Sequence, residues 1–299
     1  MKIYDCFMFF DEEMLLDLRL NILNQYVDKF VITEATYMHS GKPKKLLFDI
    51  NKFSKFKDKI IYNVVDEQPP DIETVYEKDY DKKDTRGQKL INNSNKREHY
   101  QREKANEVLR EIDDDDIVII NDVDEIPNLK EVNFKSINKK LIFFKQKMFF
   151  YKFNLLHEEI SWTGSRACKK KNFISPQWMR DTKDKKYPFW RLDTILSKNK
   201  YSSIHYVKEG GWHFTNIKSA EDIEKKFSNF LHHQDFEYSG LKLNDIKKMV
   251  NSRKILYDHS ADQTKFKWSG SKTLKKISLD NMPEYIKNNY EKYKNWLDV

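Results

Sequence analysis

The first half of the chain alternates between short apolar runs and amphipathic stretches. The apolar runs are rich in β-branched residues and predict buried strands at residues 3–10, 29–35, 59–65 and 117–122. Between them, apolar residues spaced three and four apart predict helices at residues 12–24 and 97–111, and polar residues 66–94 predict a long loop. Buried strands that alternate with helices predict an α/β domain with a mostly parallel sheet flanked by helices.

The second half has a less regular pattern. One long aromatic strand is predicted at residues 141–151 and a shorter strand at 203–207. Residues 154–200 mix Trp, Arg, Pro and Lys without a clear period, which is typical of a loop-rich region that faces a ligand. Two further helices are predicted, beginning at Ser219 and near Pro283.

The pattern shows no internal repeat and no low-complexity linker. We therefore expect one principal domain at residues 1–260. A helical C-terminal extension at residues 261–299 should pack on that domain.

Composition narrows the possible partners. The chain has 299 residues, of which 39% are hydrophobic and 14% aromatic, enough for a large core. The net charge of +8 is compatible with nucleic acid, an anionic membrane or a nucleotide phosphate. The longest run of basic residues is only Lys169-Lys170-Lys171, and acidic residues are interspersed, so we interpret the charge as a solvated surface and expect no nucleic-acid partner.

The cysteines and the N-terminal pattern predict a compartment. Cys6 and Cys168 have neither a disulfide-framework nor a metal-type spacing, which favours a reducing environment. The first residues lack the pattern of a signal peptide or a membrane anchor, and no transmembrane segment is evident. These observations predict a cytoplasmic protein.

The most informative segment follows the strand at residues 117–122. Asp122 and Asp124 end it, Glu125 comes next, and Pro127 stops any regular continuation. Carboxylates at the C-terminal end of a parallel strand lie where open α/β sheets bind ligands. Such oxygens suit Mn²⁺ or Mg²⁺, which can bridge to a diphosphate. Two alternatives remain open: a polar turn after a core strand, and a phosphohydrolase that uses the same aspartates.

A second segment, Gly210-Gly211-Trp212-His213, supplies a further candidate ligand. A neutral imidazole beside carboxylates would complete a Mn²⁺ site. The alternative is a structural histidine beside a core tryptophan. Because an ion that holds a diphosphate needs more than two protein ligands, the pairing with the aspartates favours the ligand role for His213.

Other segments offer groups for a nucleotide and a sugar. Glu34 could accept hydrogen bonds from a base or ribose, while Lys42 and Arg102 could neutralise phosphates. Trp162 precedes Thr163-Gly164 and suits stacking on a pyranose ring, and Trp212 is a second candidate for contact with an acceptor. Each of these residues could equally have a structural role.

Taken in order, these segments resemble glycosyltransferase family 17. The resemblance covers roughly residues 1–260. The matching segments are residues 4–7, 15–20, 27–31, 34–36, 40–43, 101–102, 122–127 and 211–213.

The resemblance implies a GT-A type fold, which is a Rossmann-like and mostly parallel sheet flanked by helices. It implies a UDP-sugar donor, UDP-N-acetylglucosamine in particular, a glycan acceptor and inversion at the anomeric carbon. On this interpretation Asp124 binds Mn²⁺ (or Mg²⁺), Asp122 contacts ribose or the metal, and His213 completes the coordination.

The catalytic base is predicted from position alone. Glu159, just before Trp162, is the first choice, followed by Glu209 and Asp235. A protein that binds glycans or nucleic acid without turnover is the remaining alternative.

Overall fold

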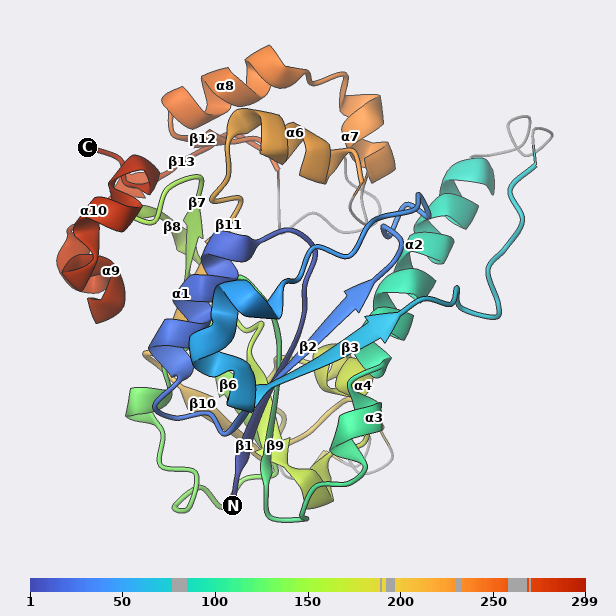
Figure 1. Cartoon of the computed structure of the whole chain (residues 1–299), viewed down its shortest axis with the longest axis vertical. Helices are drawn as coiled ribbons and strands as arrows, with labels where there is room; N and C mark the ends of the chain where they lie inside the picture. The colour runs from blue at the N-terminus through green and yellow to red at the C-terminus, as the bar shows by residue number, and fades with distance from the viewer. Residues whose placement is uncertain (77–84, 189, 192–196, 230–232, 258–267, 269) are drawn as a thin grey trace.

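Two β-sheets form the frame of the protein in the computed structural model of the chain (Figure 1). The structure describes residues 1–76, 85–188, 190–191, 197–229, 233–257, 268 and 270–299, without the side chains of residues 131 and 233–235. The fold is mixed α/β, and most strand pairs of the larger sheet are parallel.

The larger sheet has seven strands in the order β10-β6-β9-β4-β1-β2-β3. Only β9 is antiparallel to its neighbours among the strand pairs described. Its strands are β1 (Ile3–Met8), β2 (Lys29–Ala35), β3 (Ile60–Val65), β4 (Ile117–Asp122), β6 (Leu141–Phe144), β9 (Arg166–Lys169) and β10 (Ile204–Val207).

The smaller sheet has five strands in the order β14-β8-β7-β11-β5. Its strands are β5 (Glu125–Pro127), β7 (Gln146–Phe150), β8 (Leu155–Trp162), β11 (Gly211–Thr215) and β14 (Lys275–Lys276). A separate pair joins β12 (Lys254–Ile255) to β13 (Lys272–Thr273).

Helices surround both sheets. In Figure 1, α6 and α8 lie together at the end of the molecule above β7 and β11, whereas α9 and α10 lie beside α1. The helices are α1 (Glu13–Leu23), α2 (Thr85–Glu103), α3 (Asn106–Leu109), α4 (Pro176–Asp181), α6 (Ala220–Phe227), α7 (His233–Ser239), α8 (Leu243–Asn251), α9 (Glu284–Asn288) and α10 (Tyr290–Tyr293).

The strands and the first helix predicted in the first half of the chain are confirmed, within two residues at each end. The predicted loop over residues 66–94 is wrong in its last part, because α2 begins at Thr85. The side chains that α2 buries are largely polar, including Asn93, Gln101 and Arg102. An apolar period could not reveal such a helix.

The single strand predicted at residues 141–151 is also wrong. The chain leaves the larger sheet after Phe144 and joins the smaller one at Gln146, with Lys145 between them. Both strands are largely buried, and only Lys145, Gln146 and Lys147 separate their apolar residues in the sequence. Residues 154–200, expected to be loop-rich, contain β8, β9 and α4.

The C-terminal extension is only partly helical. Before α9 and α10 it contributes β13 and β14, and β14 pairs with β8. Side chains such as Ile286 and Tyr293 belong to the same apolar core as α1. The expected boundary at residue 260 lies outside the described residues.

A buried ion pair ties the core to the end of β4. Arg19 of α1 donates hydrogen bonds to both carboxylate oxygens of Asp5 at 2.7 and 2.6 Å, and both side chains are fully buried. The same guanidinium donates to the backbone carbonyl of Glu125 at 2.7 Å. Asn121 also donates to Asp5, at 2.6 Å. These contacts fix the turn that follows β4.

No helix in the described part of the chain combines the length and the apolarity needed to cross a bilayer.

Candidate functional site

The site forms where the turn after β4 meets β11. Asp122 is the last residue of β4, and Glu125 opens β5, which pairs antiparallel with β11. The register places His213 opposite Glu125. The Nε2 atom of His213 therefore lies 3.6 Å from the Oδ1 atom of Asp124. Two segments almost ninety residues apart in the sequence thus bring an imidazole and a carboxylate together, as the sequence predicted.

Two arginines hold the carboxylate of Asp122. Arg180 of α4 lies 2.9 Å from one oxygen and Arg102 of α2 lies 3.3 Å from the other. Burial opposes ionisation of Asp122, but the charges of Arg180 and Arg102 outweigh it and lower the pKa of this carboxyl well below its usual range. Asp122 is therefore a fixed anion whose side chain remains 34% exposed.

Glu125 is the buried centre of this network. Its Oε2 atom accepts hydrogen bonds from the backbone N–H of Asp122 at 2.8 Å and from Arg180 at 2.7 Å. Its Oε1 atom accepts from Trp162 at 2.6 Å and from Arg180 at 3.1 Å. Glu125 therefore acts as a structural anchor: it orients the aspartate turn, the indole of Trp162 and the guanidinium of Arg180.

Gly164 makes room for this anchor. A Cβ atom at this position would lie 1.8 Å from Oε1 of Glu125 and 2.4 Å from Nε1 of Trp162. We expect Gly164→Ala to displace both side chains and to destabilise the protein by about 1–3 kcal/mol, the usual cost of overpacking. Urea unfolding measures this cost. The control is Ser161→Ala, on strand β8 just before Gly164. Gly240→Ala would not serve, because Gly240 has a φ of +67°, which alanine adopts only with strain. Equal stability of both variants would contradict the packing described here.

Asp124 is less constrained than Asp122. Besides His213, it has Lys226 of α6, whose Nζ atom lies 3.9 Å from Oδ2. Burial opposes ionisation of Asp124, and the positive charges that His213 and Lys226 can carry lower the pKa of the carboxyl nevertheless. Both contacts are longer than a hydrogen bond. The carboxylate is therefore anionic and available to a ligand.

The imidazole of His213 also has spare bonding capacity. Its Nε2 atom lies 2.9 Å from Oγ1 of Thr215, while its buried Nδ1 atom has no hydrogen-bond partner among the residues described. The ring stacks on Trp162, with the ring centroids 5.1 Å apart. Oxygen from Asp124 and nitrogen from His213 are a donor set that suits Mn²⁺.

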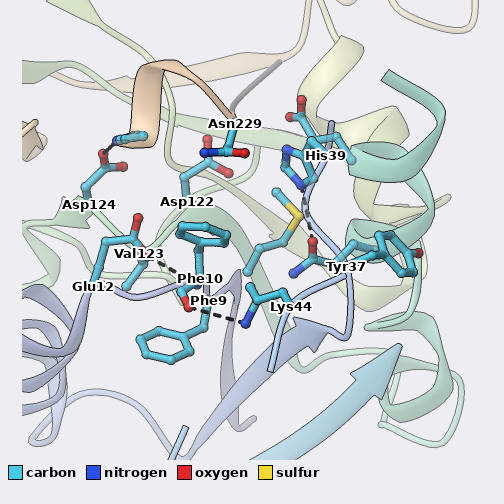
Figure 2. Close-up of a pocket in the computed structure, with 14 residues that line it drawn as sticks. Phe9, Phe10, Glu12, Tyr37, His39, Lys44, Asp122, Val123, Asp124 and Asn229 are labelled. Carbon is cyan, nitrogen blue, oxygen red and sulfur yellow. Dashed lines mark hydrogen bonds and ion pairs between the residues drawn. The ribbon is translucent and has the colours of Figure 1, made fainter. Parts of the chain in front are cut away.

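The first cavity opens between the ends of β1, β2 and α2, and we call it the polar cavity because most of its lining residues are polar or charged. Figure 2 shows Asp122 and Asp124 on one side of it, facing Tyr37 and His39 on the other. Its volume is about 240 Å³, and its remaining lining residues are Met8, Phe9, Phe10, Glu12, Lys44, Glu98, Gln101, Val123, Lys226 and Asn229.

A second cavity, of about 210 Å³, opens from the same carboxylates toward the smaller sheet and helices α6 and α8. Its walls are largely aromatic and include Trp162, Phe227 and Trp268. Asp122, Asp124 and Lys226 line both cavities. The aspartate turn thus separates a polar cavity from an aromatic one.

Family comparison decides what kind of protein has this site. A model of glycosyltransferase family 17 matches residues 1–298, which is nearly the whole chain. The chain belongs to glycosyltransferase family 17. The comparison with curated proteins gave no match. The match confirms the resemblance found in the sequence and extends it through the C-terminal residues. A glycosyltransferase requires a sugar donor and an acceptor.

Three residues expected to bind the donor do not line the polar cavity of this family 17 glycosyltransferase. Glu34 is fully buried, and its oxygens accept hydrogen bonds from Lys44, from two backbone N–H groups and from Tyr62. Lys42 lines a separate groove beside α7 and α8, whereas Lys44 lines the polar cavity. Arg102 lies behind Asp122, where it pairs with Glu98 at 2.6 Å.

The two tryptophans expected at the acceptor lie in different environments. Trp162 lines the aromatic cavity, where its ring stacks on His213. Trp212 precedes His213 on β11, so its side chain projects from the opposite face of the strand. It packs against the main apolar core and donates to the carbonyl of Asn281 at 3.0 Å.

Two of the three carboxylates expected to act as base in this glycosyltransferase, Glu159 and Glu209, line neither cavity. Glu159 is 62% exposed and pairs with Lys272 at 2.6 Å, and this hydrogen bond lowers its pKa. Glu209 is 72% exposed, with Lys147 at 3.3 Å. Asp235 belongs to α7, but its side chain lies outside the described residues.

Sequence reasoning missed Arg180, Lys226 and the anchoring role of Glu125. Arg180 lies in a short helix within a region that has no apolar period, so no sequence signal was available for it. Lys226 lies on the helix predicted from Ser219, and only its tertiary placement reveals its role. Glu125 follows the two aspartates directly, so a signal was present.

Proposed function

We propose that this family 17 glycosyltransferase is a GT-A type enzyme. In this proposal it transfers N-acetylglucosamine from UDP-N-acetylglucosamine to a hydroxyl group of a glycan, with inversion. The observation that carries the proposal is the position of Asp122 and Asp124 at the carboxyl end of β4, between a polar cavity and an aromatic one. The identity of the sugar rests on the resemblance of the sequence.

The polar cavity suits the nucleotide. Phe10 offers an aromatic face to a base, and Tyr37 and Lys44 also line this cavity, with the amine of Lys44 paired to Glu34. Asp122, fixed by its two arginines, can accept hydrogen bonds from ribose hydroxyls. Lys226 lines both cavities and can neutralise charge on a phosphate between them.

The residues present fit a divalent ion whose coordination the donor completes. Asp124 and His213 would hold it. These are two protein ligands, one fewer than the sequence led us to expect, because Arg102 and Arg180 pair with the carboxylate of Asp122. No group of three His, Cys, Asp or Glu side chains suited to a metal occurs in the described parts of the chain, so the remaining positions would fall to phosphate oxygens and water. When bound, Mn²⁺ or Mg²⁺ supplies Lewis-acid stabilisation of the departing diphosphate, worth several kcal/mol.

The proposed reaction is a single displacement. The acceptor oxygen forms a bond to the anomeric carbon while the bond from that carbon to the phosphate oxygen breaks, and the hydroxyl proton passes to a base. Lys226 lies at the junction of the cavities, where the leaving group would develop charge. Trp162 and His213 wall the aromatic side of that junction and limit access of water.

A thermal-shift panel tests the donor and the metal together. The panel compares UDP-N-acetylglucosamine, UDP-glucose and GDP-mannose, each with Mn²⁺ and with a chelator. Binding at a hundred times Kd adds about 2.7 kcal/mol to the free energy of unfolding, so Tm should rise by several degrees. We expect this rise for UDP-sugars with Mn²⁺, and the largest for UDP-N-acetylglucosamine. A rise with GDP-mannose alone, or one indifferent to the chelator, would contradict the proposal.

A further inference from the structure

Two residues that line the aromatic cavity have buried polar atoms without a hydrogen-bond partner among the residues that the structure describes. These atoms are Oδ1 of Asn216 and Nε1 of Trp268. Asn216 is 5% exposed and Trp268 is 6% exposed. A buried polar atom without a partner costs about 1–3 kcal/mol. Two such atoms beside one small cavity favour a ligand that supplies the missing hydrogen bonds.

The backbone around this cavity is strained as well. Asn216 and Tyr151 have φ angles of 55° and 64°, in the left-handed region that favours glycine. Both residues line the cavity. For a bulky residue such as Tyr151, this conformation persists only where the surrounding structure enforces it. Strain of this kind concentrates at binding sites.

The walls suit one class of ligand. Trp162 is held in place by its hydrogen bond to Glu125 and by its stacking on His213. Phe227 and Tyr257 pack edge-on against Trp268, with centroid distances of 4.8 and 5.2 Å. Rigid aromatic faces pack well against the apolar face of a sugar ring, whose hydroxyl groups need both donors and acceptors.

We propose that this cavity binds the terminal sugar ring of the acceptor, with Asn216 and Trp268 as its hydrogen-bonding partners. This proposal rests on the proposed function, because the proposed function assigns the polar cavity to the nucleotide. An inverting displacement needs the acceptor on the side opposite the leaving diphosphate. The aromatic cavity extends from Asp122 and Asp124 toward the smaller sheet, whereas the polar cavity extends toward β1, β2 and α2.

Two variants remove the polar atoms with little disturbance of the fold. Asn216→Gly deletes the amide and suits the left-handed backbone, and Trp268→Phe deletes the indole N–H but keeps an aromatic ring. Arg253→Gly is the matched control, because Arg253 has a φ of 54° and does not line the cavity.

Saturation-transfer NMR with methyl glycosides of mannose, galactose, glucose and N-acetylglucosamine, in the presence of UDP and Mn²⁺, measures occupation of the cavity. We expect at least one glycoside to bind, and its Kd to rise about tenfold in Asn216→Gly and in Trp268→Phe but not in Arg253→Gly. The Kd for UDP, measured by calorimetry, should stay the same in all three variants.

Three results would overturn the assignment. The first is that no glycoside binds, and the second is that both cavity variants bind the glycoside as tightly as the wild type. The third is that the cavity variants bind the intact UDP-sugar more weakly but bind the glycoside unchanged. The last result would assign the cavity to the sugar of the donor. If UDP itself fails to bind while glycoside binding still depends on Asn216, the proposed donor is wrong and the sugar site stands.

Discussion

Replacing Asp124 with asparagine should lower kcat/KM for sugar transfer by at least about a hundredfold. The carboxylate lines both cavities and lies 3.6 Å from Nε2 of His213, so in the proposed mechanism it carries the charge that holds the metal and the diphosphate. Loss of several kcal/mol of charge stabilisation corresponds to two or more orders of magnitude in rate. Release of UDP in the presence of acceptor measures the effect.

The fold of Asp124→Asn should be intact. Among the described residues, the side chain makes two long ionic contacts, and the backbone of its turn is held by Arg19 and by the carboxylate of Glu125. Asp115→Asn makes the same chemical change at the opposite end of β4, where Asp115 pairs with Lys169 and Lys171 on the surface, and it should leave transfer unchanged.

Chelation of divalent ions should inactivate the wild-type enzyme to a similar extent, and added Mn²⁺ should restore it. Asp124→Asn should gain little from added Mn²⁺. Wild-type turnover by this variant, with the unfolding curve unchanged, would remove Asp124 from the catalytic machinery.

The sequence predicted the parts of the site that follow apolar strands. Four consecutive apolar residues predicted β4, so Asp122 and Asp124 could be placed at the carboxyl end of a buried strand. The position of His213 depended on the antiparallel pairing of β5 with β11, which no local pattern encodes. Its proximity to Asp124 was inferred from the chemistry of a metal site and is present in the structure.

The parts that were missed depend on polar groups in the interior. The side chains that helix α2 buries are largely polar, as at Gln101 and Arg102. No apolar period therefore marked the beginning of this helix at Thr85. Arg180 neutralises Asp122 from a helix of six residues, too short for a periodic signal. Buried polar networks obey no sequence period, because each member is selected for a partner distant in the chain.

Lys42 and Lys44 show that a sequence pattern can indicate a segment without indicating which of its residues faces a cavity. Lys42, in the segment after β2, was expected to contact a phosphate of the donor, but in the structure Lys44 lines the first cavity and Lys42 lines a neighbouring groove. Gly41 has a φ of 92°, so the chain turns sharply between β2 and Lys44. Which of two nearby lysines faces a ligand depends on such a turn.

The buried ion pair between Asp5 and Arg19 links the site to the core. Arg19 donates to Asp5 and to the carbonyl of Glu125, and its guanidinium lies 4.6 Å from the ring centroid of Phe7. Asp5 of β1 and Arg19 of α1 thereby help to fix the shape of the aspartate turn, although neither residue lines either cavity. This connection gives a physical reason for the family resemblance at residues 4–7 and 15–20.

Arg19→Met should therefore destabilise the protein by about 3–5 kcal/mol, the cost of leaving one charge of a buried pair uncompensated. The fully buried carboxylate of Asp5 would keep only the hydrogen bond from Asn121, at 2.6 Å, among the described contacts. Urea unfolding measures the loss. Asp5→Asn combined with Arg19→Met should recover part of it, because the double variant buries no lone charge. Destabilisation of less than about 1 kcal/mol, or a double variant less stable than Arg19→Met, would show that the pair does not hold the turn by charge.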